Sequence, residues 1–214
     1  MIASENIPEI DFNIGGLRKH ALLCVFIKEN ELNVLDRKVR NWLLHTVCSA
    51  SRHYTKVRDL IVSHNNASQK QDDGVVLHLL DVSEHLEDCV TAIFRSCMAV
   101  QRMSYKNSTC EIFSESHKYK IEKISRMRNQ FEHMHSQIIS GEVGNGPVSI
   151  TLSDEGEFIR FRSLKIEALF LYELLKGLYH VVASMFDNFD VSSEIEAIGA
   201  LKLSITANAR VIKK

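Results

Sequence analysis

The chain has 214 residues, of which 45% are hydrophobic, so it is long enough to bury one substantial core. Its formal net charge is −1 at pH 7, which excludes a general attraction to polyanions and limits any nucleic-acid binding to a local patch. The five cysteines include no Cys-x-x-Cys pair, and the first residues carry acids rather than a long apolar run. We therefore expect reduced thiols in a cytoplasmic protein with neither a signal peptide nor a membrane span.

Amphipathic helices are predicted for the first half of the chain. After an irregular lead-in over residues 1–16, a short helix is expected over 17–28. Apolar residues then recur every three or four positions over 33–64 and again over 75–105. This period predicts two long helices, which a polar loop separates.

The second half begins with a predicted helix over 114–140 and continues with a β-hairpin over 147–162. In the hairpin, apolar and polar residues alternate on both sides of the acidic turn Ser153-Asp154-Glu155-Gly156. A last core helix is expected from Ile166 to Met185, and a helical or frayed tail is expected over 191–214.

These elements predict a mostly α fold, a helical bundle of four to six helices with a small β-hairpin inserted before the last core helix. We expect residues 1–72 to form an N-terminal helical segment packed on the bundle. Residues 73–190 would form the bundle itself, including the hairpin.

The predicted helix over 75–105 carries an acidic face formed by Asp81, Glu84, His85 and Asp88. Such a face could ligate a metal or neutralise a basic partner, but charged residues on a helix are more often simply solvated, and we favour that interpretation. The chain has a single Glu-x-x-His pair where a di-iron site needs two, and it lacks phosphate-binding and dinucleotide-binding glycine patterns. We therefore predict no metal and no cofactor.

The stretch from Lys118 to Ile139 has two distinct faces if it is helical. Apolar residues at steps of three and four form a core-facing stripe, namely Ile124, Met127, Phe131, Met134 and Ile138. Arg126, Asn129 and His133 fall together on the opposite, polar side. Arg128 lies about 140° from His133 on an ideal helix, so the two could meet only through side-chain reach, a helix irregularity or a second subunit.

The segment Arg128-Asn129-x-x-x-His133 resembles the Arg-x(4 to 6)-His signature of the HEPN superfamily, in which a polar residue commonly follows the arginine. The resemblance extends over 73–187, with a long helix before the motif and a final helix after it. It implies an all-α bundle that dimerises with the motif at the interface. Many such proteins are metal-independent endoribonucleases of toxin–antitoxin or phage-defence systems, and others are non-catalytic.

Two further segments match the same spacing, Arg40 to His45 and Arg58 to His64. We prefer the copy at Arg128 because it lies in a basic stretch with Lys118, Lys120, Lys123 and Arg126. The copy at Arg40 encloses Trp42-Leu43-Leu44, so a packing role is expected there. In one HEPN subgroup with nucleotidyltransferase-like antitoxins, a tyrosine lies two residues after the motif histidine, and here that residue is His135.

The chemistry that these residues can support is RNA cleavage by attack of the 2′-hydroxyl. His133 suits the proton transfers, because imidazole titrates near neutral pH. Arg128 can hold a phosphate bidentately, and Asn129 can orient the phosphate or His133. Further substrate-binding candidates are Arg126, Lys123 and His135.

We therefore predict a metal-independent endoribonuclease with a composite site in a homodimer, with RNA as substrate, no membrane contact, and an antitoxin or defence-system protein as a further partner. The alternative is a non-catalytic HEPN-like protein that dimerises or binds a partner. In that case Arg128 could simply form an i,i+4 ion pair with Glu132.

Overall fold

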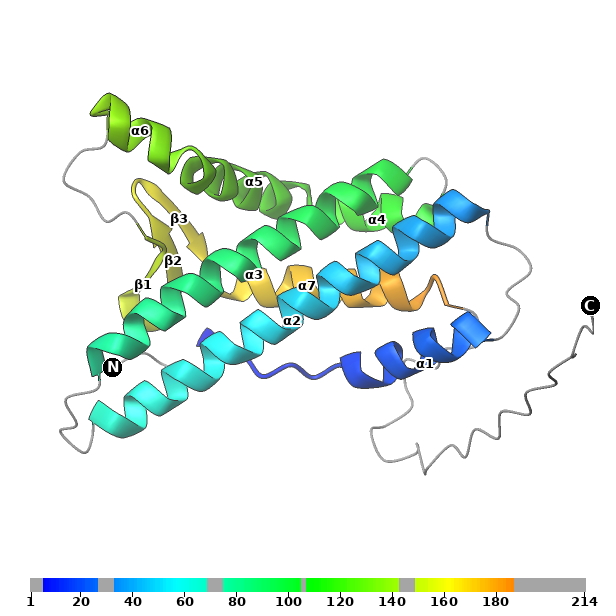
Figure 1. Cartoon of the computed structure of the whole chain (residues 1–214), viewed down its shortest axis with the longest axis horizontal. Helices are drawn as coiled ribbons and strands as arrows, with labels where there is room; N and C mark the ends of the chain where they lie inside the picture. Colours follow the sequence, from blue (N-terminus) through cyan, green and yellow to red (C-terminus); the bar gives the residue numbers. More distant parts are fainter. Residues whose placement is uncertain (1–5, 27–32, 69–74, 105–106, 143–148, 187–214) are drawn as a thin grey trace, which may run out of the picture.

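The computed structural model describes residues 6–26, 33–68, 75–104, 107–142 and 149–186. Within these ranges the chain forms seven α-helices and a three-stranded antiparallel sheet that precedes the last helix (Figure 1). The predicted mostly α fold with a small β insertion is thereby confirmed. None of the helices in the described ranges combines the length and the apolar character needed to span a membrane.

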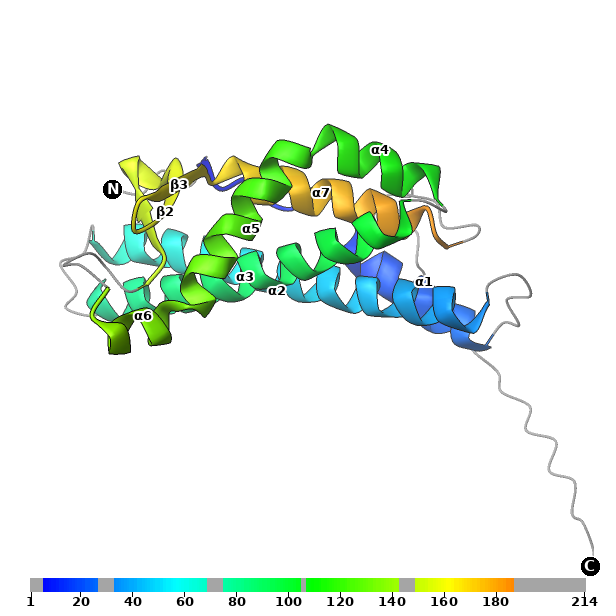
Figure 2. The same cartoon turned by 90° about the horizontal axis from the view of Figure 1, so that it is seen from above.

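Two long helices form one layer of the molecule. Helix α2 (Val34–Ser68) and helix α3 (Val75–Met103) run side by side in opposite directions (Figures 1 and 2). Their apolar stripes meet, and the side chains of Val47, Ile61 and Ile93 are fully buried between the layers. The two long helices predicted from the apolar period are confirmed, with ends shifted by a few residues.

The second layer contains α7 (Leu169–Ala183) and the sheet, while α1 (Ile14–Phe26) lies against α2 (Figures 1 and 2). The start of α1 is fixed by Asn13, whose side-chain oxygen accepts a hydrogen bond from the Gly16 amide at 2.6 Å. The segment before α1 is anchored by Tyr54, whose hydroxyl donates to the carbonyl of Pro8 at 3.0 Å. Part of the predicted irregular lead-in is therefore packed on the core.

The predicted single helix over 114–140 is wrong, because this region forms α4 (Ser108–Ser116), α5 (Lys118–Glu132) and α6 (Met134–Ser140). The breaks fall at His117 and His133, whose ψ angles of 11° and 1° leave the helical range. The direction changes because α4 packs against both α3 and α7, whereas α5 crosses α3 and reaches β3 (Figure 2). This division also raises the helix count above the expected four to six.

The sheet contains β1 (Thr151–Ser153), β2 (Phe158–Phe161) and β3 (Leu164–Glu167) in that order. The first two strands confirm the predicted hairpin, in which Thr151 pairs with Arg160, although residues 147–148 lie outside the described ranges. Strand β3 was not predicted. It contains Ile166, which had been assigned to the last helix, and α7 begins only at Leu169.

The buried core is continuous from α1 to α7. It includes Leu17 and Leu43 from the predicted N-terminal segment as well as Met127 and Leu178 from the predicted bundle. The boundary at residues 72 and 73 stays a prediction, and the tail over 191–214 lies outside the described residues.

Candidate functional site

The HEPN-like motif lies at the end of α5, where the chain turns into α6. Asn129 and His133 are exposed to solvent, and Arg128 is half-buried with 22% of its side chain exposed. The other substrate-binding candidates lie on the same two helices: Arg126 and His135 are exposed and Lys123 is half-buried. All six predicted site residues can therefore be reached from the surface at least in part.

The guanidinium of Arg128 has three neighbours. It forms an ion pair with Glu132, it donates a hydrogen bond from Nη1 to Asn129 Oδ1 at 3.2 Å, and its central carbon lies 4.9 Å from the ring centroid of Phe94 on α3. The i,i+4 ion pair with Glu132, which the sequence offered as the alternative role of Arg128, is therefore present. Because a carboxylate and an amide oxygen already accept its hydrogen bonds, a phosphate would have to displace Glu132 or share the guanidinium with it.

His133 is the single residue between α5 and α6. Its backbone amide donates to the carbonyl of Asn129 at 3.2 Å, and its carbonyl accepts from the amide of Gln137 at 3.2 Å. Asn129 and His133 are therefore one turn apart along the chain. Within the described part of the chain, the imidazole of His133 makes neither a hydrogen bond nor an ion pair, so both ring nitrogens are available to a ligand.

The motif residues are brought only partly together within one chain. Arg128 contacts Asn129, and Asn129 precedes His133 by one helical turn, but among the described contacts none joins Arg128 to His133. The helix irregularity, one of the three routes that the sequence left open, is present at His133 but brings the two side chains into no described contact. A second subunit is the remaining route for a mechanism that uses both side chains on one phosphate.

The basic stretch around the motif is partly neutralised. Lys120 forms an ion pair with Glu173 of α7, so its charge is compensated. Lys123 lies 5.3 Å from the ring centroid of Tyr119, and neither Lys123 nor Arg126 has a carboxylate partner among the described residues. Together with the exposed Lys118 at the start of α5, Lys123 and Arg126 therefore remain free to attract an anion, as far as the described residues show.

A groove of about 820 Å³ lies between α2, α3 and the end of α7. Its lining combines arginines with aromatic rings: Arg40, Arg95, Arg102, Trp42 and Phe94. The Trp42 side chain is 46% exposed, and Phe94 is the ring beneath Arg128, so the groove adjoins the motif. Trp42, Arg95 and Arg102 are exposed in this groove. An exposed ring beside arginines suits single-stranded nucleic acid, which stacks bases on rings and places phosphates beside cations.

Arg40, which begins another segment with the motif spacing, has the packing role expected for it. The guanidinium lies 4.3 Å from the ring centroid of Phe186 and donates to the carbonyl of Met185 at 3.4 Å. Only 5% of Arg40 is exposed. These contacts attach the residues that follow α7 to α2.

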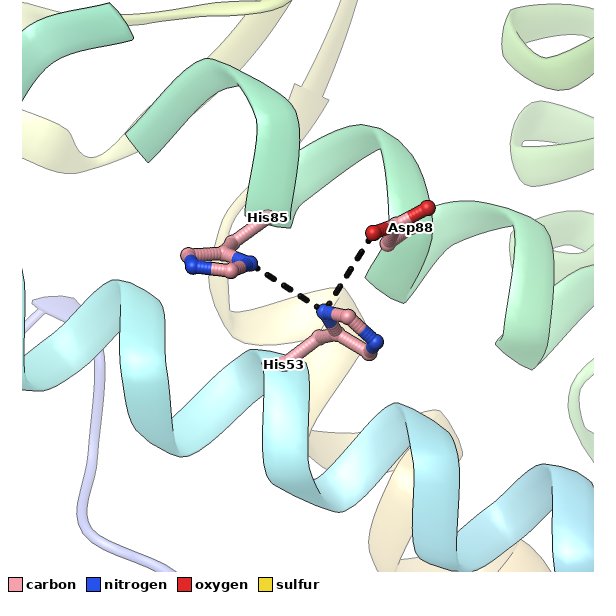
Figure 3. Close-up of side chains that lie close together, drawn as sticks. All are labelled: His53, His85 and Asp88. Carbon is pink, nitrogen blue, oxygen red and sulfur yellow. Dashed lines mark hydrogen bonds and ion pairs between the residues drawn. The ribbon is translucent and has the colours of Figure 1, made fainter. Parts of the chain in front are cut away.

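A second cluster of reactive side chains lies between α2 and α3 (Figure 3). His53 of α2 points toward His85 and Asp88 of α3; the two Nδ1 atoms are 3.2 Å apart, and His53 Nδ1 is 3.5 Å from Asp88 Oδ2. Burial lowers the pKa of His53, and the nearby Asp88 carboxylate partly opposes this effect. His85 and Asp88 were recognised in the sequence as part of an acidic face, whereas His53 was missed because no sequence signal fixes the register that places it opposite them.

The five cysteines form no disulfide, as expected. Burial raises the pKa of Cys89 to about 12 and that of Cys110 to about 11, so both are inert thiols at neutral pH.

Comparison of the chain with models of protein families, with curated proteins and with solved structures finds no significant match. The geometry described above is therefore the basis for any functional proposal.

Proposed function

We propose that the chain is a HEPN-like, metal-independent endoribonuclease that completes its active site by pairing two copies of the motif in a homodimer. The observation that carries this proposal is the exposed imidazole of His133, which has no protein partner among the described residues and lies one turn after Asn129 and five residues after Arg128.

The proposed reaction needs a base, an acid and a cation. His133 of one copy takes the proton from the 2′-hydroxyl, whose oxygen attacks the adjacent phosphorus. The second copy of the same imidazole gives a proton to the departing 5′-oxygen. The products are a 2′,3′-cyclic phosphate and a 5′-hydroxyl, and no metal takes part.

Arg128 has the role of holding the phosphate oxygens as negative charge builds up on them. Asn129 keeps the guanidinium in place through its 3.2 Å hydrogen bond. Lys123, Arg126 and His135 extend the contact to neighbouring phosphates, since they lie at least partly exposed on the same two helices. The groove with Trp42 and Phe94 would then bind the unpaired bases on one side of the cut.

The proposed dimer is supported by apolar side chains beside the motif. Ile138 and Ile139 of α6 are 51% and 84% exposed, so the predicted core-facing position of Ile138 is wrong. A second copy of α6 would cover both residues and bring the two His133 imidazoles to the same interface. Cleavage of cellular RNA would place the protein in the cytoplasm, and it would require control by an antitoxin or by the trigger of a defence system.

The ion pair between Arg128 and Glu132 favours a second candidate function. In this alternative the motif helix is a non-catalytic dimerisation or partner-binding surface, and Arg128 only stabilises the contact of α5 with α3. The exposed histidine would then be one residue of the interface.

The test is incubation of the wild type and of His133→Ala with structured and single-stranded RNA in EDTA, with analysis of the fragment ends. The proposal expects 2′,3′-cyclic phosphate ends from the wild type and loss of cleavage in a variant that is still folded and dimeric. Equal cleavage by both proteins, or cleavage by neither, would reject the catalytic role and favour the binding protein.

A further inference from the structure

The cluster of His53, His85 and Asp88 has the composition of a metal site. His85 and Asp88 are three positions apart on α3, so they share one face of the helix, and His53 faces them from α2 (Figure 3). Two imidazole nitrogens and one carboxylate are a ligand set that first-row transition metals commonly use.

The distances fit a single ion. The ligand atoms all lie within 4.8 Å of one another, and the two closer pairs are 3.2 Å and 3.5 Å apart. Metal–ligand bonds of about 2.0 to 2.2 Å at tetrahedral angles separate neighbouring ligand atoms by about 3.3 to 3.6 Å. A small movement of Asp88, whose side chain is 54% exposed, would bring the third pair to this separation.

The short distance between the two imidazole nitrogens is favourable only if a proton or a metal ion lies between them. Two Nδ1 atoms at 3.2 Å can form a hydrogen bond only if one carries hydrogen and the other offers its lone pair. A metal ion accepts both lone pairs at once. It leaves each Nε2 protonated.

The cluster opens onto a cavity of about 500 Å³, which His53 and His85 help to line. Arg18 of α1 and Arg52 and Lys56 of α2 line the same cavity, with Asp59 as the acid on its wall. Three protein ligands leave a coordination position open, and the positive lining favours water, hydroxide or a small anion in it.

We propose that His53, His85 and Asp88 bind one divalent transition-metal ion such as Zn²⁺, with a fourth position that faces the basic cavity and takes water or an anion. The mixed nitrogen and oxygen set disfavours Mg²⁺ and Ca²⁺, which prefer oxygen ligands alone. The bound ion connects the middle of α2 to α3. This inference is independent of the proposed RNA chemistry, which uses no metal, and it departs from the sequence-based expectation of no metal site.

The experiment uses the full chain with His133→Ala and His135→Ala, so that the exposed histidines of the motif cannot bind metal. After treatment with EDTA and removal of the chelator, Co²⁺ is added as a spectroscopic probe, and Zn²⁺ is then added in competition. The proposal expects one equivalent of Co²⁺ with the ligand-field absorption of a four-coordinate or five-coordinate site, displacement by Zn²⁺, and a rise in Tm when Zn²⁺ binds.

His53→Gln and His85→Gln should weaken Zn²⁺ binding by more than the 10-fold to 100-fold that loss of an outer-shell partner typically costs, and Asp88→Asn should weaken it too. His45→Ala, which removes an exposed histidine from the same helix α2, is the matched control and should bind as the parent does. Circular dichroism of each metal-free variant separates loss of the site from loss of the fold.

The inference is overturned if the parent binds no Co²⁺, or if folded His53→Gln and His85→Gln bind it as the parent does. Inorganic phosphate tests the open position. A change in the Co²⁺ spectrum supports a position that takes anions, whereas an unchanged spectrum at saturating phosphate rejects that part of the proposal.

Discussion

The carboxylate of Glu132 forms an ion pair with the guanidinium of Arg128, one turn earlier on α5. This pair holds in place the cation that the proposed mechanism assigns to the phosphate. Glu132 would therefore compete with RNA for Arg128, and its negative charge would also repel the phosphate.

Glu132→Gln should consequently strengthen RNA binding. A partly exposed ion pair of this kind contributes up to about 1 kcal/mol, so we expect about fivefold tighter binding at low salt and a smaller gain at high salt. The measurement is fluorescence anisotropy with a labelled single-stranded RNA. Glu122→Gln, which removes an exposed acid from the same helix, is the control. Unchanged affinity in Glu132→Gln would assign Arg128 to packing alone.

Trp42 is predicted to stack on a base of the RNA, because its half-exposed ring lines the groove that adjoins Arg128 through Phe94. Stacking on an aromatic ring is worth about 1 to 3 kcal/mol per base, so Trp42→Ala should weaken RNA binding by about 5-fold to 150-fold. Trp42→Phe should retain most of the affinity. Leu80→Ala removes an exposed apolar side chain from α3 and should have little effect. Equal affinities for Trp42→Ala and the wild type would place the RNA elsewhere.

Ile139 is predicted to lie in the dimer interface. Its side chain is 84% exposed in the single chain, and a glutamate there would bury an unpaired charge at the interface. Ile139→Glu should therefore shift the chain toward monomer in sedimentation equilibrium and reduce RNA cleavage at protein concentrations where the wild type is dimeric. Leu22→Glu places the same charge at a 65% exposed position of α1, and it should leave the dimer intact. If Ile139→Glu remains dimeric in sedimentation equilibrium, the proposed interface is contradicted.

Asp11 is predicted to make stability depend on pH. Its carboxylate accepts a hydrogen bond from Lys176 Nζ at 2.7 Å, and the pKa of Asp11 falls below its ordinary value because of hydrogen bonds from Lys176 and then from Tyr172. A lowered folded-state pKa means that the stabilisation is complete above the ordinary pKa of 3.8 and is lost as the pH falls through the lower folded-state value.

Asp11→Asn should thus lower the free energy of unfolding at pH 7, by about 0.2 to 1 kcal/mol because the ion pair is exposed. The difference from the wild type should shrink as the pH falls below 3.8. Urea unfolding at several pH values measures it, with Glu111→Gln of α4 as the control. A difference that stays constant down to the acid transition would contradict the assignment.

The long helices and the first hairpin were predictable because their patterns are local. The apolar period over α2 and α3 predicts helices with one buried face. The alternation on both sides of Gly156 predicts strands with one buried face. The breaks at His117 and His133 were not predictable in this way, since the segment contains no proline or glycine before Gly141. They arise from tertiary packing, because α4 packs against α3 and α7, whereas α5 crosses α3 and reaches β3.

Strand β3 was missed for a different reason. Ile166 fits both the helical period of the residues that follow it and the alternation of a short strand. The turn before the strand has a positive φ of 53° at Arg162, where a glycine would have been the recognisable signal. Its conformation is therefore held by the packing of Phe161 and Ile166 in the core.

The two candidate sites differ in the same way, since one is formed by residues close in sequence and the other by residues far apart. Arg128, Asn129 and His133 are close in sequence, so their spacing could be recognised from the chain alone. His53 and His85 are 32 positions apart and meet only through the register of α2 against α3. The register of two packed helices does not follow from the apolar period of each, because several registers bury the same stripes.

The most direct test of the central claim compares two substrates that differ in a single oxygen. One is an RNA that the wild type cleaves in EDTA, and the other has a 2′-deoxy nucleotide on the 5′ side of the cleaved bond. The account predicts that the wild type cuts the first and leaves the second intact at that bond, and that His133→Ala cuts neither. Cleavage of the deoxy substrate at the same bond would contradict attack by the 2′-hydroxyl and would reject the proposed mechanism.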